Sequence, residues 1–168
     1  ILNIVLISTT PLVFAGIGEL VTEKSGVLNL GLEGLMLVGA VSGFISLVIT
    51  GNYFYSFILS ILSGVVLSSI FAFFVLRLLT NQIATGLALT IFGIGLSAML
   101  GKKFAGTPIN GLSPYYLIIF SFILVFLINY ILYKTKAGLI IRAVGENHHS
   151  AYALGYDVIK TRYLTIIF

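Results

Sequence analysis

The chain has 168 residues, of which 59% are hydrophobic and 8% are charged, and its formal net charge is +4. A soluble domain typically carries about 25% charged residues, so this composition excludes a soluble globule and indicates a polytopic, all-α membrane protein. The basic residues stand beside apolar runs instead of forming an aromatic-interleaved patch, so we expect no nucleic acid as a partner. Cysteine is absent, which excludes disulfides and thiolate metal ligands.

Five apolar runs approach the 20 residues that a transmembrane helix needs, and a sixth begins near Tyr163. Pro11 lies inside the first run, and proline kinks a helix because it cannot donate a backbone hydrogen bond. We expect residues 1–168 to form one transmembrane domain, a fragment of a longer subunit, because the sequence starts without methionine and stops inside an apolar run. The fold would be a transmembrane helical bundle in membrane lipid, in which broken helices are one way to line a central path. The five runs are approximately residues 1–18, 27–49, 57–76, 83–100 and 115–133.

Lysine and arginine are distributed unevenly between alternate loops. A short polar loop, residues 19–24, is expected after the first run. One side of the membrane would hold Lys24 of this loop, Arg77 and the five basic residues within 134–162. Lys102 and Lys103 fall on the other side. Loops rich in lysine and arginine stay in the cytoplasm, so we expect residues 134–162 to form a cytoplasmic loop.

Polar side chains interrupt the second and fourth runs. Glu33 is costly at mid-depth, where an ionised side chain costs about 2.5–3.5 kcal/mol, and Asn29 stands four residues before it, on the same face of a continuous helix. One interpretation is a polar wall of a substrate path, and the other is that Glu33 lies near the cytoplasmic interface and pairs there. Thr85 and Thr90 of the fourth run complete the candidate path residues.

Small residues recur at four-residue spacing in the same two runs. Gly39 and Gly43 form such a pair in the second run, and Ala84 and Ala88 form one in the fourth. Small residues at this spacing let neighbouring helices approach closely. The pattern predicts close helix contacts, but packing around a path and ordinary tight packing produce the same pattern.

No catalytic constellation is evident, so we expect no enzyme activity, no cofactor and no metal in this chain. The GKK run at residues 101–103 lacks the spaced upstream glycine and the final Ser or Thr of a phosphate-binding loop. His148 and His149 are adjacent, and adjacent side chains on a helix diverge, so they do not suit a shared metal ion. A secondary transporter or channel that uses Glu33 for ion or proton coupling is the competing class.

The cytoplasmic loop contains the signals of one short helix. Asn147 suits the N-cap, Glu146 adds negative charge near the helix start, and Gly155 suits the C-terminal stop, so a helix is expected over residues 148–154.

Ala151 and Leu154 are expected on one face of this short helix. A small and an aliphatic side chain there could seat in a groove of a partner protein. The alternative is a helix that lies on the lipid headgroups, which the flanking basic residues would also favour.

Three long stretches resemble, in order and spacing, the permease subunit of bacterial ABC importers for simple sugars, nucleosides and branched-chain amino acids. The resemblance covers essentially the whole chain, and the first stretch is most similar to the nucleoside and simple-sugar branch. Where the amino-acid branch has an INFAHGE-like run, this chain has LNLGLEG. The three stretches are GELVTEKSGVLNLGLEGLMLVGA (18–40), TGLALTIFGIGLSAMLG (85–101) and GLIIRAVGENHHSAYALGYDVIKTRYL (138–164).

The resemblance implies a coupling helix that sits in a cleft of a cytoplasmic ATP-binding subunit, which binds and hydrolyses ATP. It also implies a second permease subunit, identical or different, an extracytoplasmic substrate-binding protein, and a multi-pass location in the bacterial inner membrane. His148, His149 and Ser150 depart from the family pattern, in which proline is common after Glu-Asn. The coupling residues by resemblance are Arg142, Gly145, Glu146, Asn147, Ala151 and Gly155.

Overall fold

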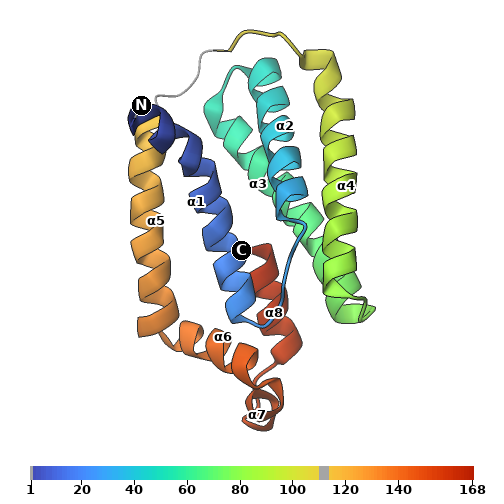
Figure 1. Ribbon diagram of the computed structural model, residues 1–168, viewed down its shortest axis with the longest axis vertical. Coiled ribbons are helices and arrows are strands. Elements are labelled where there is room, and N and C mark those ends of the chain that lie inside the picture. The colour runs from blue at the N-terminus through green and yellow to red at the C-terminus, as the bar shows by residue number, and fades with distance from the viewer. Residues whose placement is uncertain (1, 110–113) are drawn as a thin grey trace. The chain divides into compact units, whose positions relative to one another are not determined.

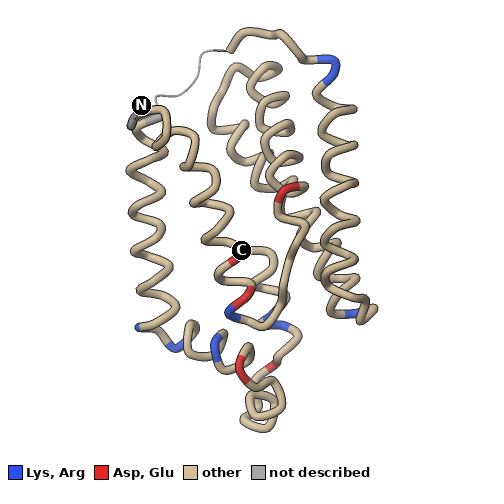
Figure 2. Tube along the Cα trace, viewed as in Figure 1, with Lys and Arg blue, Asp and Glu red and all other residues tan. Residues whose placement is uncertain are grey.

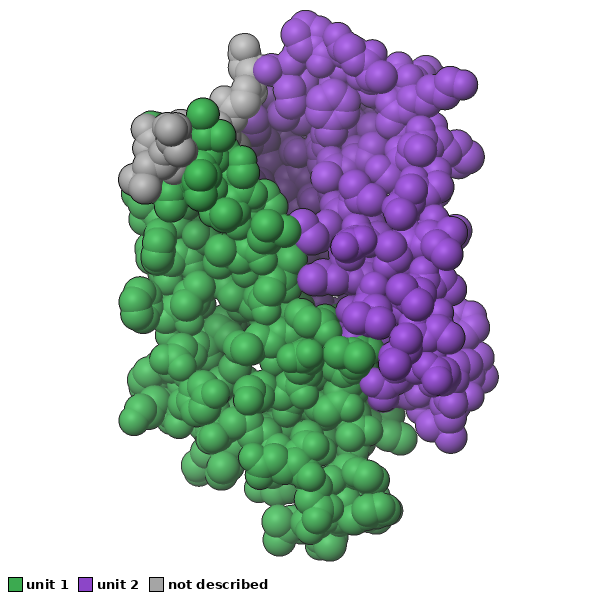
Figure 3. Space-filling view, in the orientation of Figure 1, with its two compact units in different colours: residues 1–28, 111–166, 168 green, residues 29–110, 167 purple. Residues whose placement is uncertain are grey.

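The computed structural model describes residues 2–109 and 114–168, and every regular element in these stretches is helical (Figure 1). Within the described residues, five helices are long and apolar enough to cross a membrane. The expected all-α transmembrane fold is therefore confirmed. The chain divides into two compact units, one of residues 1–28, 111–166 and 168 and the other of residues 29–110 and 167 (Figure 3).

Each unit is built from helices that are joined largely by short connections. The first unit contains α1 (Leu2–Lys24), α5 (Pro114–Lys134), α6 (Lys136–Glu146), α7 (His148–Ala153) and α8 (Val158–Ile167). The second contains α2 (Leu32–Thr50), α3 (Tyr53–Ala72), the π-helical turn η1 (Phe73–Arg77), α4 (Gln82–Gly101) and the 3₁₀ turn η2 (Lys102–Phe104). Since η1 continues α3 directly, the third span extends from Tyr53 to Arg77.

In the first unit, α1 and α5 pack along a shared apolar seam. Ile17 and Val21 of α1 are buried together with Ile128 and Leu132 of α5. Lipid tails are as apolar as these side chains, so the association of the two helices rests on close van der Waals packing and not on transfer from water.

The predicted polar loop at residues 19–24 is wrong, because these residues form the end of α1. Val21 and Thr22 are buried on one side of the helix, whereas Glu23 and Lys24 on the other side are exposed. The helix continues past the apolar run because its inner side remains packed, which a one-dimensional hydropathy pattern does not reveal.

The second span begins later than predicted, at Leu32 instead of Val27. The chain leaves α1 at Gly26, whose φ of +82° is favourable only for glycine, and stays non-helical through residue 31. Polar groups of this segment form hydrogen bonds other than those of a regular helix. The Asn29 side chain accepts a hydrogen bond from the Gly31 N–H at 2.9 Å, and the Leu30 carbonyl accepts one from the Thr90 hydroxyl at 2.8 Å.

Within the second unit, α2 packs closely on α3 through Gly39 and Gly43, as their spacing predicts. The Ser60 hydroxyl donates to the Gly39 carbonyl at 2.8 Å, and the Ser56 hydroxyl donates to the Gly43 carbonyl at 2.6 Å. Because a glycine leaves its carbonyl accessible from the side, a serine on the neighbouring helix can reach it.

The contact between α2 and α4 is made by other glycines, which the four-residue spacing of small residues did not predict. A Cβ built at Gly93 of α4 would lie 2.5 Å from Cα of Gly34, and one built at Gly86 would lie 2.8 Å from the Leu30 nitrogen. The predicted close contact at Ala84 and Ala88 is wrong, since both are exposed and line an open groove.

Candidate functional site

The basic residues of the first unit gather at one end of it, where α1 and α5 finish (Figure 2). The predicted cytoplasmic loop begins there with α6, which the sequence analysis did not predict. Thr135 caps α6 by accepting a hydrogen bond from the Gly138 N–H at 3.2 Å. A Cβ at Gly138 would clash with the carbonyls of Ile131 and Leu132, so glycine allows α6 to turn sharply off the end of α5.

A signal for α6 was present in the sequence. Its apolar and charged residues alternate with helical periodicity, which is typical of a helix with one buried face. Val144 is fully buried on that face. The Arg142 guanidinium carbon lies 4.9 Å from the centre of the Tyr133 ring, an arrangement that allows a cation–π interaction.

The short helix predicted from caps is confirmed as α7, His148–Ala153. The Asn147 side chain accepts a hydrogen bond from the Ser150 N–H at 3.1 Å, as an N-cap should. Gly155 ends the helix with a φ of +87°, and the following N–H of Tyr156 donates to the Ala151 carbonyl at 3.1 Å. Glu146 is exposed and is the last residue of α6, directly before the α7 cap.

The expectation that Ala151 and Leu154 share one face is wrong. Ala151 is 2% exposed and faces inward, whereas Leu154 is 75% exposed. Since α7 ends at Ala153, helical periodicity no longer sets the direction of the Leu154 side chain. Tyr152, which is 74% exposed, accompanies Leu154, and we call these two residues the α7 tip.

Gly145 places the end of α6 directly against the end of α1. A Cβ at this position would clash with the Lys24 carbonyl and would lie 3.1 Å from the Gly26 nitrogen. Of the six coupling residues suggested by resemblance, Gly145 and Ala151 therefore pack inward, and Asn147 and Gly155 shape the ends of α7.

A buried polar cluster joins α1 to α8, and the sequence analysis missed it. The Thr165 hydroxyl lies 2.8 Å from the Ser25 hydroxyl, the Thr22 hydroxyl donates to the Thr165 carbonyl at 3.1 Å, and the Arg162 Nε donates to the Ser25 carbonyl at 3.0 Å. Burial lowers the pKa of Arg162 below its usual value, but an arginine pKa lies so far above neutrality that the guanidinium stays charged. Hydroxyl residues in apolar runs are common, so no local signal distinguished these.

The four candidate path residues occupy different environments in the second unit. Asn29 is buried in the segment before α2, and the Thr90 hydroxyl is bonded to the next residue of that segment, so these two lie at one junction. Glu33 is exposed in the first turn of α2. The expectation that Asn29 and Glu33 share a helix face is wrong, because α2 begins only at Leu32.

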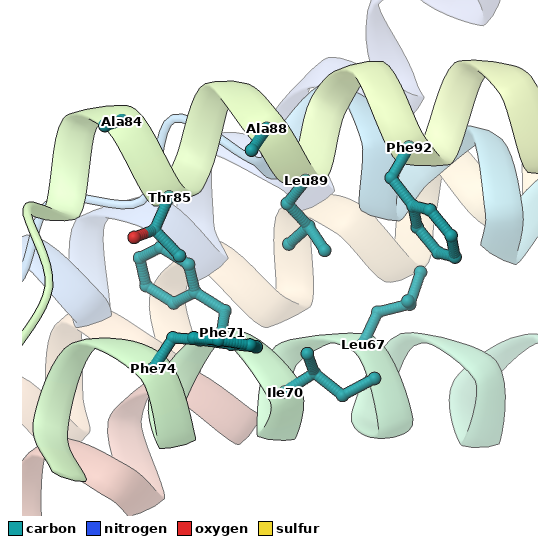
Figure 4. A pocket seen from close by; sticks show the side chains of 9 residues that line it. All are labelled: Leu67, Ile70, Phe71, Phe74, Ala84, Thr85, Ala88, Leu89 and Phe92. Atoms are coloured by element: carbon teal, nitrogen blue, oxygen red, sulfur yellow. The ribbon is translucent and has the colours of Figure 1, made fainter. Parts of the chain in front are cut away.

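Thr85 lies elsewhere, on the wall of an open groove of about 490 Å³ between α3, η1 and α4 (Figure 4). Its hydroxyl donates to the Asn81 carbonyl at 2.8 Å. The other eight residues that line the groove are apolar, so the groove lacks the polar groups that would orient a sugar or a nucleoside.

Among the residues that the structure describes, no three histidine, aspartate or glutamate side chains come together as metal ligands. The rings of His148 and His149 lie with their centres 4.1 Å apart on the exposed side of α7.

Comparison with known proteins assigns the family. Residues 1–168 match the family described as branched-chain amino acid transport system / permease component, and the chain belongs to that family. With its five apolar helices, the chain is thus a multi-pass protein of the cytoplasmic membrane. No solved structure matches the chain significantly.

Individual relatives are ABC transporter permeases whose names give sugars or nucleosides as solutes. TsgC13 of Haloferax volcanii, whose name gives glucose, is 36% identical over 99% of this chain and 58% of its own length. The guanosine permease protein NupQ of Bacillus subtilis and the nucleoside permease protein NupC of Lactococcus lactis are each 28% identical over 96% of this chain and 60% and 61% of their own lengths. The chain thus spans about three fifths of these relatives, and the resemblance to the sugar and nucleoside branch is confirmed.

Proposed function

We propose that the chain is the transmembrane permease of an ATP-driven importer for a small polar solute, either a nucleoside or a simple sugar. The observation that carries this proposal is the family match over residues 1–168, together with relatives whose names specify glucose, guanosine and nucleosides. The permease hydrolyses nothing itself. ATP is bound by a separate cytoplasmic subunit, a second permease completes the path, and a substrate-binding protein delivers the solute from outside.

The α7 helix is the proposed contact with the ATP-binding subunit. Its tip presents Tyr152 and Leu154 to solvent, and a tyrosine beside a leucine is suited to an apolar cleft with a polar rim. The cap at Asn147 and the left-handed turn at Gly155 hold the helix in a defined shape before any partner binds. Such preorganisation reduces the entropy that docking must overcome.

The solute path is proposed to include Asn29, Glu33, Thr85 and Thr90. The support is strongest at the junction of Asn29 and Thr90, where the non-helical segment before α2 contains buried polar groups. In membrane transporters, interrupted backbone and buried polar side chains are found next to cavities and substrate sites. Alternating access would then require two arrangements of the packed helices, selected by closure of the ATP-binding subunits.

The proposal is tested by purifying the intact transporter through a tag on this permease and measuring how much ATP-binding subunit accompanies it. We expect the subunit to copurify, and the combined Tyr152→Ala and Leu154→Ala substitutions to reduce its recovery about tenfold or more, as removal of anchor residues does. The matched control is Tyr130→Ala, because Tyr130 is similarly exposed, on the membrane helix α5.

Three results would contradict the proposal. Absence of an ATP-binding subunit from the purified complex would exclude an ATP-driven importer. Normal recovery with the altered α7 tip would remove the docking assignment. Uptake that follows an ion gradient and is lost in Glu33→Gln would favour the secondary transporter or channel instead.

A further inference from the structure

The strongest unassigned feature of the first unit is the buried polar cluster between the end of α1 and α8, which we call the hydroxyl clasp. It consists of Thr22, Ser25, Arg162 and Thr165. Three of its side chains are almost inaccessible, with exposed fractions of 5% for Thr22, 0% for Ser25 and 4% for Thr165. Its hydrogen bonds connect residues that are 137 to 143 positions apart in the chain.

These bonds differ from those of the other buried hydroxyl groups in the same unit. The Thr10 hydroxyl donates to the Leu6 carbonyl and the Ser121 hydroxyl to the Ile118 carbonyl, each within its own helix. The Thr165 hydroxyl bonds to the Arg162 carbonyl within α8 and also reaches the Ser25 hydroxyl, and the Arg162 cation donates to the Ser25 carbonyl. The bonds between α1 and α8 are therefore additional to the local ones, and a bond from a charged donor is stronger than one between neutral groups.

Close glycine contacts bring the end of α6 against the hydroxyl clasp. Gly145 touches the Lys24 carbonyl and Gly26, and a Cβ built on Gly26 would lie 3.1 Å from a guanidinium nitrogen of Arg162. The ends of α1 and α6 and the body of α8 therefore meet within one packed joint, where neither glycine can be enlarged without displacing its neighbours.

The joint is connected to α7 along the chain twice, through α6 before it and through α8 after it. Only Asn147 separates α6 from α7, and residues 154–157 separate α7 from α8. Asp157 caps α8 by accepting a hydrogen bond from the Lys160 N–H at 2.9 Å. Short connections thus join α7 to both α6 and α8, and both of these helices contact the end of α1 at the joint.

We propose that the hydroxyl clasp is the rigid joint through which displacement of α7 is transmitted to α1 and α8. This inference rests on the proposed importer function. With the clasp closed, α1 and α8 follow α7 as one body. Without it, α7 can move with the ATP-binding subunit while α1 stays behind, so that ATP is hydrolysed with little solute moved. Thr22, Ser25, Arg162 and Thr165 are thus positioning residues for transport.

The test measures solute transported per ATP hydrolysed by the intact transporter in proteoliposomes, with radiolabelled guanosine and glucose as probes. We expect Ser25→Ala and Thr165→Val each to lower this ratio about fivefold, the effect of one lost buried hydrogen bond. Because both changes break the same bond, the double variant should be no worse than the poorer single variant. Thr165→Ser, which restores the hydroxyl, should recover the ratio of the parent transporter.

Thr10→Val and Ser121→Ala are the matched controls, because they remove buried hydroxyl groups that are bonded within their own helices. Both should keep the parent ratio. Clasp variants that transport as much solute per ATP as the parent would overturn the proposal, whether the amount of folded transporter is normal or reduced. A purely structural role would lower the amount of folded transporter and leave the solute transported per ATP unchanged. A different result would contradict the proposed function: a parent transporter that moves neither probe and whose ATP hydrolysis is changed by neither.

Discussion

Single glycines decide how closely α4 can approach the start of α2. Gly34 and Gly93 face each other backbone to backbone, and Gly86 lies against the backbone of Leu30 and Gly31. In a membrane, this proximity replaces the hydrophobic effect as a source of packing energy, and it also brings the Thr90 hydroxyl within reach of the Leu30 carbonyl.

At this residue scale we predict that Gly93→Ala destabilises the folded permease by about 1–3 kcal/mol, the usual cost of overpacking. The added Cβ would lie 2.5 Å from Cα of Gly34, so α2 and α4 would have to separate. The measurement is the thermal unfolding midpoint of the purified transporter in detergent. Gly95→Ala is the control on the same helix, because a Cβ there meets nothing within 4 Å and alanine favours a helix. Equal midpoints for the two variants would contradict the close contact.

At the scale of elements, α7 is a short helix whose stability depends on its ends. With six residues it is too short to be stable in isolation, so the Asn147 cap and the Gly155 turn contribute a large share of its order. The inward side of α7 adds only Ala151, which is small enough to let the helix lie close to its support.

We predict that Gly155→Val disorders the end of α7 and uncouples ATP hydrolysis from transport while the subunit still inserts. The φ of +87° is strained for any L side chain by about 1–2 kcal/mol, and a β-branched residue is the least tolerant. Space is not the cause, since a Cβ there meets nothing within 4 Å. The measurement is solute transported per ATP hydrolysed.

Gly155→Asn serves as the control for this prediction. Asparagine adopts the left-handed conformation more readily than other non-glycine residues, so this variant should stay close to the parent ratio. Normal coupling in Gly155→Val would show that the shape of this turn does not matter for transport.

At the scale of the whole molecule, lysine and arginine are distributed unevenly between the ends of the spans. α1, the α3–η1 span and α5 end at Lys24, Arg77 and Lys134, whereas α4 ends beside Lys102 and Lys103. Since loops rich in lysine and arginine stay in the cytoplasm, we predict that α6 and α7 lie on the cytoplasmic side.

Residues 1–168 contain no cysteine, so this topology can be tested with single cysteine substitutions. We predict that a membrane-impermeant maleimide labels Lys102→Cys in intact cells and labels His149→Cys only after the membrane is opened. Both positions are exposed, so a difference in labelling reports the side of the membrane and not burial. The opposite pattern would invert the topology and place α7 outside.

Features that depend on neighbouring residues were predictable from the sequence. The spans from Tyr53 to Arg77 and from Gln82 to Gly101 lie within a few residues of the predicted ranges, because hydropathy over about 20 residues determines insertion. The α7 helix was also predicted nearly residue by residue, since an N-cap and a left-handed C-terminal turn act within one helical turn.

What the sequence by itself determined is therefore the membrane class, the approximate spans, the α7 helix and, through three ordered motifs, the permease family. Only the tertiary structure decided that α1 continues to Lys24, that Asn29 precedes α2, that Ala151 faces inward and that Ser25 meets Thr165. The physical reason is that each of these depends on a contact with a distant part of the chain. A hydroxyl or a glycine in an apolar run has the same local appearance whether it faces lipid, its own helix or a partner 140 residues away.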